Sequence, residues 1–209
     1  MGFKRGQNPH HPRKGSSIKV EPIRDLNAIA RIKENLQAQG QFRNLCLFTM
    51  GINTAWRCGE LLSIKLRDVL HLKEGDMLRL KQSKTGEYRY TPINREVFRV
   101  LRLWLAQYAE KYPRLLEKPN SALFLSNRRV ALKVPSVINL VKKWCAGAGL
   151  FGRYASHTLR KTWGYQQRVT FNKSIEVISE AFGHSSVNVT RAYIGILREE
   201  VRALYKNEI

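Results

Sequence analysis

The chain has 209 residues, of which 43% are hydrophobic and 25% are charged, so it is long and apolar enough for one large folded domain. No apolar run approaches the roughly 18 residues that span a bilayer, and the start MGFKRGQNPHHPRKGSS lacks the apolar centre of a secretory signal. We therefore expect neither a membrane partner nor secretion. Three scattered cysteines (Cys46, Cys58 and Cys145) argue against a disulfide scaffold and favour the reducing cytoplasm.

The charge of the chain is strongly positive. Its 37 lysine and arginine residues outnumber 16 acidic residues, which gives a formal net charge of +21. Residues 1–20 contain five basic residues and no acid, and residues 118–175 contain eleven and no acid. A compact protein that carries this self-repulsion usually binds a polyanion. Nucleic acid is therefore the expected partner, with a merely solubilising surface as the alternative.

The first half of the chain predicts helices followed by a small sheet. Residues 1–22 contain prolines and glycines and show no hydrophobic periodicity, so we expect them to form a basic arm. Alternating apolar and polar residues over 69–93 predict an antiparallel sheet of about three strands. Before this sheet, the helical spacing of apolar residues predicts helices over residues 24–40, 42–52 and about 60–64.

The second half predicts helices almost throughout. Asn94 is a suitable N-cap for a helix whose apolar stripe runs from Val97 to Tyr112. A loop over 113–119 and a short strand over 122–126 are expected next. Helical patterns then cover residues 136–145, 156–169, 174–182 and 187–193, with a tail near 199–206. The expected fold class is mainly α with a small antiparallel β-sheet (α+β).

The segment SHTLRK contains a candidate anion site. With Ser156 as N-cap, His157 and Arg160 stand three residues apart on the first turn of one helix. A guanidinium, an imidazole and the unpaired N–H groups of a helix N-terminus can together bind an anion. The pattern is common, and an ordinary exposed helix start is the alternative.

A second candidate segment is GHSSVNVTRAY. Gly183 is expected to end one helix, Ser185 or Ser186 to cap the next, and His184 to lie in the joint between them. Tyr193 follows nine residues after this histidine. Valines and isoleucines surround Tyr193 in the sequence, so a core aromatic is the alternative.

Two further candidates lie upstream. In TAWRCGELL, Arg57 and Glu60 share one face at a helix start, with a surface ion pair as the alternative. Lys84 is expected at the tip of a hairpin, where a solvated turn lysine is the alternative. Two other patterns carry no site: the glycine motif at 147–152 follows a helix and not a strand, and His10–His11 lack metal-ligating neighbours.

Taken in order, these pieces resemble the tyrosine recombinase (phage integrase) family. The resemblance rests on the arginine in TxxRxxELL, the hairpin lysine, HxLR, and GHSS with a tyrosine nine residues after its histidine. It implies that Arg57 and Arg160 clamp the scissile phosphate, that Glu60 helps to hold Arg57, and that Tyr193 is the nucleophile. The remaining implied catalytic residues are Lys84, His157 and His184.

The activity implied by the resemblance is that of a site-specific DNA recombinase or integrase, which cleaves and rejoins strands through a 3′-phosphotyrosyl intermediate. Such an attack needs concentrated positive charge, because a tyrosine of pKa about 10 is almost fully protonated near neutral pH. No step needs a metal or a cofactor. The alternatives are a type IB topoisomerase-like relaxing enzyme and a non-catalytic DNA-binding protein.

The resemblance also predicts the domain organisation. Residues 23–197 would form a tyrosine recombinase catalytic domain. Members of the family usually carry a helical core-binding domain before the catalytic domain, and the arm of residues 1–22 is too short to supply it. The chain would then be either a catalytic fragment or a naturally short member of the family. Residues 198–209 would form a helical tail that packs on a neighbouring subunit, because strand exchange on paired double-stranded DNA sites needs a homotetramer. Ala55-Trp56 departs from the family's usual Gly-Leu.

Overall fold

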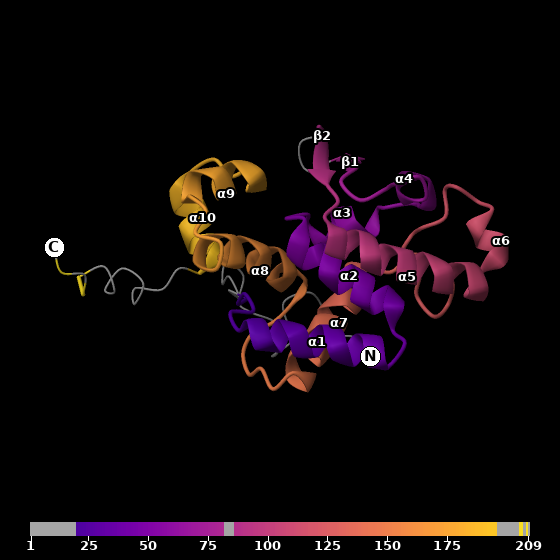
Figure 1. Cartoon of the computed structure of the whole chain (residues 1–209), viewed down its shortest axis with the longest axis horizontal. Coiled ribbons are helices and arrows are strands. Elements are labelled where there is room, and N and C mark those ends of the chain that lie inside the picture. Colours follow the sequence, from indigo (N-terminus) through magenta and orange to yellow (C-terminus); the bar gives the residue numbers. More distant parts are fainter. Residues whose placement is uncertain (1–19, 82–85, 196–204, 207, 209) are drawn as a thin grey trace, which may run out of the picture.

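The computed structural model describes residues 20–81, 86–195, 205–206 and 208, and these form a mainly helical protein with a small antiparallel sheet, as predicted (Figure 1). None of the described helices is long and apolar enough to cross a membrane. Most of the predicted basic arm and of the predicted tail lies outside the described residues. The elements are α1 (Leu26–Ala38), α2 (Phe42–Asn53), α3 (Cys58–Leu62), α4 (Leu66–Val69), β1 (Met77–Lys81), β2 (Tyr88–Pro92), α5 (Arg95–Lys111), α6 (Pro113–Leu116), α7 (Val134–Gly147), α8 (Ser156–Val169), α9 (Ile175–Phe182) and α10 (Val187–Ile194).

Helix α2 forms the centre of the protein, and α1, α5 and α8 pack around it (Figure 1). Its residues 44–51 are all buried, so the helix is enclosed on every side, as expected of a core element. Phe48 of α2 meets the Trp144 ring of α7 edge to face, with 5.7 Å between ring centroids. Both α2 and α7 also contact α8, so this packing helps to position α8.

The sheet is smaller than predicted. It has two strands among the described residues, β1 and β2, where the alternating pattern predicted about three. Residues 69–72 lie at the end of helix α4 and in the turn after it, and not in a strand. Helix α4 forms here because the Asp68 carboxylate accepts the Lys65 N–H at 2.9 Å and so caps the start of the helix. The strand expected over 122–126 is reduced to isolated bridges, and the loop expected over 113–119 contains the short helix α6.

Helix α8 has the predicted bounds but not the predicted cap. It covers Ser156–Val169, with Ser156 as its first helical residue. The N-cap is Ala155, whose N–H donates to the Thr158 hydroxyl at 3.0 Å. The next cap agrees with the sequence, because the Ser186 side chain accepts the N–H of Val189 at the start of α10.

Helices α9 and α10 pack on α8 at one end of the molecule (Figure 1). Gly164 of α8 permits this approach, because a Cβ there would lie 2.5 Å from the Phe182 ring and 2.7 Å from Ile194. Ile194 is fully buried, and it holds Tyr193 beside α8. A buried cluster joins α9 and α10 to the segment before α3, and Trp163 of α8 packs against it. The cluster consists of Ala55, Ile175, Ile178, Phe182 and Ile194.

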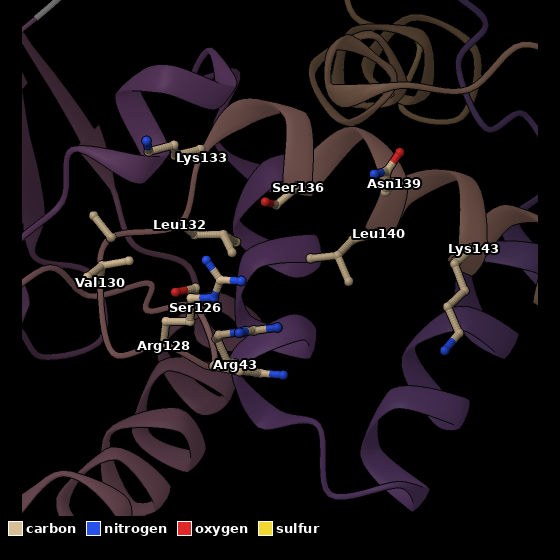
Figure 2. A pocket seen from close by; sticks show the side chains of 12 residues that line it. Arg43, Ser126, Arg128, Val130, Leu132, Lys133, Ser136, Asn139, Leu140 and Lys143 are labelled. Carbon is tan, nitrogen blue, oxygen red and sulfur yellow. The ribbon is translucent and has the colours of Figure 1, made fainter. Parts of the chain in front are cut away.

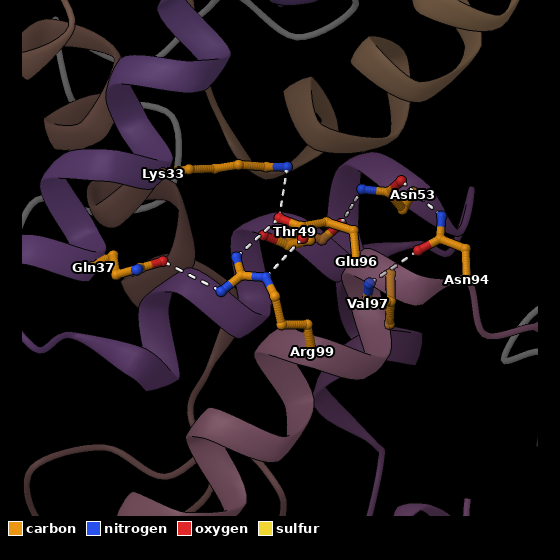
Figure 3. A network of polar contacts seen from close by, with 8 residues as sticks. All are labelled: Lys33, Gln37, Thr49, Asn53, Asn94, Glu96, Val97 and Arg99. Atoms are coloured by element: carbon orange, nitrogen blue, oxygen red, sulfur yellow. Dashed lines mark hydrogen bonds and ion pairs between the residues drawn. The ribbon is translucent and has the colours of Figure 1, made fainter. Parts of the chain in front are cut away.

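A charged network fastens α1 to α5 (Figure 3). Glu96 accepts hydrogen bonds from Lys33 of α1 at 3.1 Å and from Arg99 Nε at 2.9 Å. Figure 3 shows Arg99 also reaching Gln37, to which it donates at 3.4 Å. The hydrogen bond from Arg99, together with that from Lys33, lowers the pKa of Glu96 to about 2.

We expect Glu96→Gln to destabilise the protein by about 1 kcal/mol at pH 7, a modest figure because the group is partly solvated. The contribution requires the carboxylate, so it should be present above the ordinary pKa of 4.5 and lost as the pH falls toward 2. Urea unfolding of wild type and variant at pH 7 and pH 3 measures this difference. An equal loss at both pH values would contradict the assignment.

Candidate active site

Tyr193 and the first turn of α8 meet at the centre of the site. The Tyr193 hydroxyl lies 3.2 Å from Nδ1 of His157, within hydrogen-bonding distance. The phenol ring is half-buried and packs edge to face on Phe182 and on His184, with 5.3 and 5.1 Å between centroids. Tyr193 is therefore a core-like aromatic ring whose oxygen faces an imidazole.

Arg57 and Glu60 form a fixed pair at the start of α3. The carboxylate of Glu60 accepts the backbone N–H of Arg57 at 2.7 Å and its guanidinium Nη1 at 2.9 Å. The Glu60 side chain is fully buried, whereas that of Arg57 keeps 27% of its surface exposed. This is not an ordinary surface ion pair, because the buried acid orients an arginine whose side chain still reaches solvent.

Arg160 is almost fully buried beside the same centre. Its Nη2 donates to the carbonyl of Phe182 at 2.7 Å, which ties α8 to the end of α9. Its Nη1 is buried and makes no hydrogen bond within the described part of the chain. A buried donor without a hydrogen bond costs free energy in a protein interior, so this nitrogen is suited to bind an anionic oxygen of a substrate.

His184 lies in the joint between α9 and α10, as predicted. Its Nδ1 is 2.9 Å from the Thr190 hydroxyl, and its ring stacks at a tilt on Phe182, 4.9 Å between centroids. Gly183 adopts the left-handed conformation (φ +64°) that ends α9 and turns the chain toward His184. The structure thus brings five predicted catalytic residues to one site: Arg57, His157, Arg160, His184 and Tyr193.

Positive charge and burial act together on the ionisable groups of this site. Burial raises the pKa of Tyr193, while the charges of Arg160 and Arg57 act in the opposite direction. The pKa of His157 is lowered by burial first and then by nearby cations, which favours the neutral form of its ring. Burial lowers the pKa of Arg160 to about 10, which leaves it charged at neutral pH. A neutral imidazole can accept the phenol proton.

Two further cations belong to this neighbourhood and were not predicted as site residues. Lys161 is buried, and its Nζ lies 4.9 Å from the centre of the Tyr193 ring. Arg89 of β2 is close enough to Arg57 and Glu60 for their charges to affect its pKa. The alternation of Tyr88, Arg89 and Tyr90 along a strand is the signal that could have placed Arg89 inward.

Lys84, the predicted hairpin lysine, lies outside the described residues. The strands that precede and follow it are described, and Lys81 pairs with Tyr88 at the last described step of the hairpin. In the sequence, Lys84 falls between the end of β1 and the start of β2.

A basic groove lies between α7, the segment 126–132 and the start of α2. Figure 2 shows Ser136, Leu140 and Lys143 along α7, with Arg43 and Arg128 on the other side of the groove. No acidic side chain is among the described residues that line it. The groove draws most of its lining from the acid-free stretch of the sequence, and its charge suits a polyanion.

Comparison with known proteins shows the family. The model of the phage integrase family matches residues 21–200. "Probable integrase/recombinase YoeC" of Bacillus subtilis (strain 168) is 33% identical over 190 residues, which cover 90% of this chain and 96% of that protein. "Tyrosine recombinase XerC" of Caldanaerobacter subterraneus subsp. tengcongensis is 29% identical over 80% of this chain, but the match spans only 45% of that relative.

Solved structures agree with the fold. The crystal structure of XerA recombinase matches with a TM-score of 0.71 and 23% identity, over 89% of this chain and 65% of that one. A post-cleavage complex of XerH site-specific recombinase with palindromic difH substrate matches with a TM-score of 0.70 and 23% identity, over 95% and 57% respectively. The chain belongs to the phage integrase family, the tyrosine recombinases.

Proposed function

We propose that the protein is a site-specific DNA recombinase in which Tyr193 attacks the scissile phosphate and forms a 3′-phosphotyrosyl intermediate. The observation that carries this proposal is the 3.2 Å contact between the Tyr193 hydroxyl and His157 Nδ1, at a site where the guanidinium charges of Arg57 and Arg160 also act on Tyr193. This arrangement provides a nucleophile, a proton acceptor and fixed positive charge at one place.

Attack forms one bond and breaks another. The Tyr193 oxygen bonds to phosphorus while its proton passes to the neutral ring of His157. The bond from phosphorus to the 5′ oxygen breaks, and Lys84 is the proposed donor of a proton to that oxygen. A 5′-hydroxyl then reverses the reaction on the same or another strand, which rejoins the DNA. His184 is proposed to donate a further hydrogen bond to the phosphate.

The two arginines are proposed to hold the non-bridging oxygens. Arg57 presents a guanidinium oriented by a buried carboxylate, and Arg160 presents a buried Nη1 without a hydrogen-bond partner among the described residues. Their charges stabilise the developing negative charge more than they stabilise the substrate, because they are fixed before the reaction begins. Glu60 acts as the supporting acid.

We further propose that the protein acts as a homotetramer on paired double-stranded DNA sites in the cytoplasm, with residues 198–209 packing on a neighbouring subunit. Strand exchange between two duplexes cleaves four strands, and each cleavage needs one nucleophile. Deleting residues 198–209 should weaken assembly on DNA.

A site-selection experiment tests the function itself. Duplexes that bind the protein are enriched from a random library, converted to nicked suicide substrates, and incubated with the wild-type protein. A covalent adduct and strand exchange between two sites are expected. Supercoil relaxation without exchange would favour the topoisomerase-like alternative, and binding without any nicking would favour a non-catalytic protein; the recombinase relatives do not favour either.

The basic groove predicts the salt dependence of DNA binding. Each phosphate contact contributes about −0.9 to the slope of log K against log salt. We therefore expect Arg128→Gln with Lys143→Gln to reduce the magnitude of this slope by about 1.8, as measured by fluorescence anisotropy across a salt series. Arg102→Gln with Lys111→Gln on α5 removes the same charge away from the groove and should leave the slope unchanged. Equal slopes for both double variants would refute the groove's role.

A further inference from the structure

Arg89 lies on the inner face of the two-stranded sheet. The antiparallel register pairs it with Leu80, which is buried, whereas its neighbours Tyr88 and Tyr90 are exposed on the outer face. A charged residue on the inner face is unusual, because burial of a guanidinium costs free energy unless it meets partners there. The side chain of Arg89 is half-buried, and it points toward the site and not into solvent.

The partners of Arg89 are the two residues before Arg57. Its Nη1 donates to the carbonyl of Ala55 at 3.4 Å, and its guanidinium lies 5.0 Å from the centre of the Trp56 ring. Ala55 has φ +55°, a left-handed conformation that costs free energy for any residue except glycine. Arg89 therefore braces a strained turn that leads directly into Arg57.

The charges of this pocket are unbalanced. Arg57, Arg89 and Arg160 are close enough that the charges of Arg57 and Arg89 both lower the pKa of Arg160. Glu60 is the acid that acts on all three, and its carboxylate is already bonded to Arg57. Among the described residues, these three guanidinium groups share the Glu60 carboxylate, which leaves an excess of positive charge that suits a phosphodiester.

We propose that Arg89 is a positioning residue for the arginine pocket: it fixes the Ala55–Trp56 turn that orients Arg57, and it joins the hairpin strand to the place where the scissile phosphate binds. The role rests on the proposed strand-cleavage function. Because Arg89 lies on β2, the same contact links the sheet to the turn that leads into Arg57.

The test compares Arg89→Met with Arg79→Met. Arg79 is the matched control, because it lies on the outer face of the same sheet and also stacks on an aromatic ring, that of Tyr88 at 3.8 Å. We expect Arg89→Met to slow covalent adduct formation on the suicide duplex about tenfold to a hundredfold, the effect of a misplaced catalytic group, with DNA affinity nearly unchanged. Arg89→Lys should recover only part of the rate, and Arg79→Met should behave as wild type.

A methylphosphonate at the scissile position separates positioning from general damage to the fold. This substrate has no charge on the reacting group, so the loss caused by Arg89→Met should shrink on it. A loss of equal size on both substrates, or no loss on either, would overturn the proposal.

A second measurement does not depend on cleavage. The side-chain Nε–H of Arg57 is followed by NMR in each protein, and we expect its resonance to shift or exchange faster in Arg89→Met but not in Arg79→Met. An unchanged Arg57 resonance would overturn the proposal even for a protein that cuts no DNA. Absence of any adduct with the wild-type protein would instead count against the proposed function, so the two failures are distinguishable.

Discussion

Replacing Tyr193 by phenylalanine is expected to abolish the covalent protein–DNA adduct, with a loss of at least about a thousandfold in cleavage. Phenylalanine keeps the ring that packs on Phe182 and His184, so the fold should be retained while the nucleophilic oxygen is lost. The adduct is measured on a denaturing gel after incubation with a nicked suicide duplex.

Tyr112→Phe is the matched control. Tyr112 is also partly buried and packs edge to face on another ring, that of Tyr108 at 5.2 Å, but it lies at the end of α5. We expect this variant to form the adduct at the wild-type rate. An adduct that persists in Tyr193→Phe would rule out Tyr193 as the nucleophile.

Replacing Arg57 by lysine is expected to slow cleavage about a hundredfold while DNA affinity changes little. Lysine keeps the positive charge, but it lacks the planar guanidinium that donates to the Glu60 carboxylate and that we propose also donates to a phosphate oxygen. Arg57 is a sharper target than Arg160, whose guanidinium also holds the Phe182 carbonyl and so contributes to the fold. The measurement is the single-turnover rate of adduct formation, with the dissociation constant determined separately.

Arg99→Lys provides the corresponding control. Arg99 pairs with Glu96 three residues away, as Arg57 pairs with Glu60, but it joins α1 to α5. We expect normal cleavage in this variant. A normal rate in Arg57→Lys as well would refute the proposed phosphate clamp.

Local patterns predicted much of the fold. The stripe of apolar residues and the carboxamide of Asn94 set the start of α5, where the side chain accepts the N–H of Val97 at 2.9 Å. Gly183 and Ser186 likewise fixed the joint between α9 and α10. Such signals act within a few residues of themselves, so they can be read from the sequence. The prediction of a strand over 69–72 was wrong. Apolar and polar residues alternate there, but the Asp68 carboxylate caps a helix, and this local contact outweighs the alternation.

The site was harder to predict from the sequence than the fold, because its properties depend on contacts between segments that are distant in the chain. In the sequence, the spacing of Arg57 and Glu60 is equally typical of a surface ion pair. The burial of the acid follows only from the packing of α3 in the fold. The inward position of Arg89 depends on the register of β1 and β2, and the contact of Lys161 with Tyr193 depends on how α10 docks. The resemblance to the tyrosine recombinases predicted that the candidate residues form one site, but it did not predict Arg89 or Lys161 as part of that site.

Peptide mapping of the wild-type adduct tests directly whether Tyr193 is the nucleophile. The adduct formed on the suicide duplex is digested with nuclease and trypsin, and the peptides are sequenced by mass spectrometry. We expect the nucleotide remnant on the peptide 192–198 (AYIGILR), in which Tyr193 is the sole tyrosine. A remnant on any other residue would show that Tyr193 is not the nucleophile.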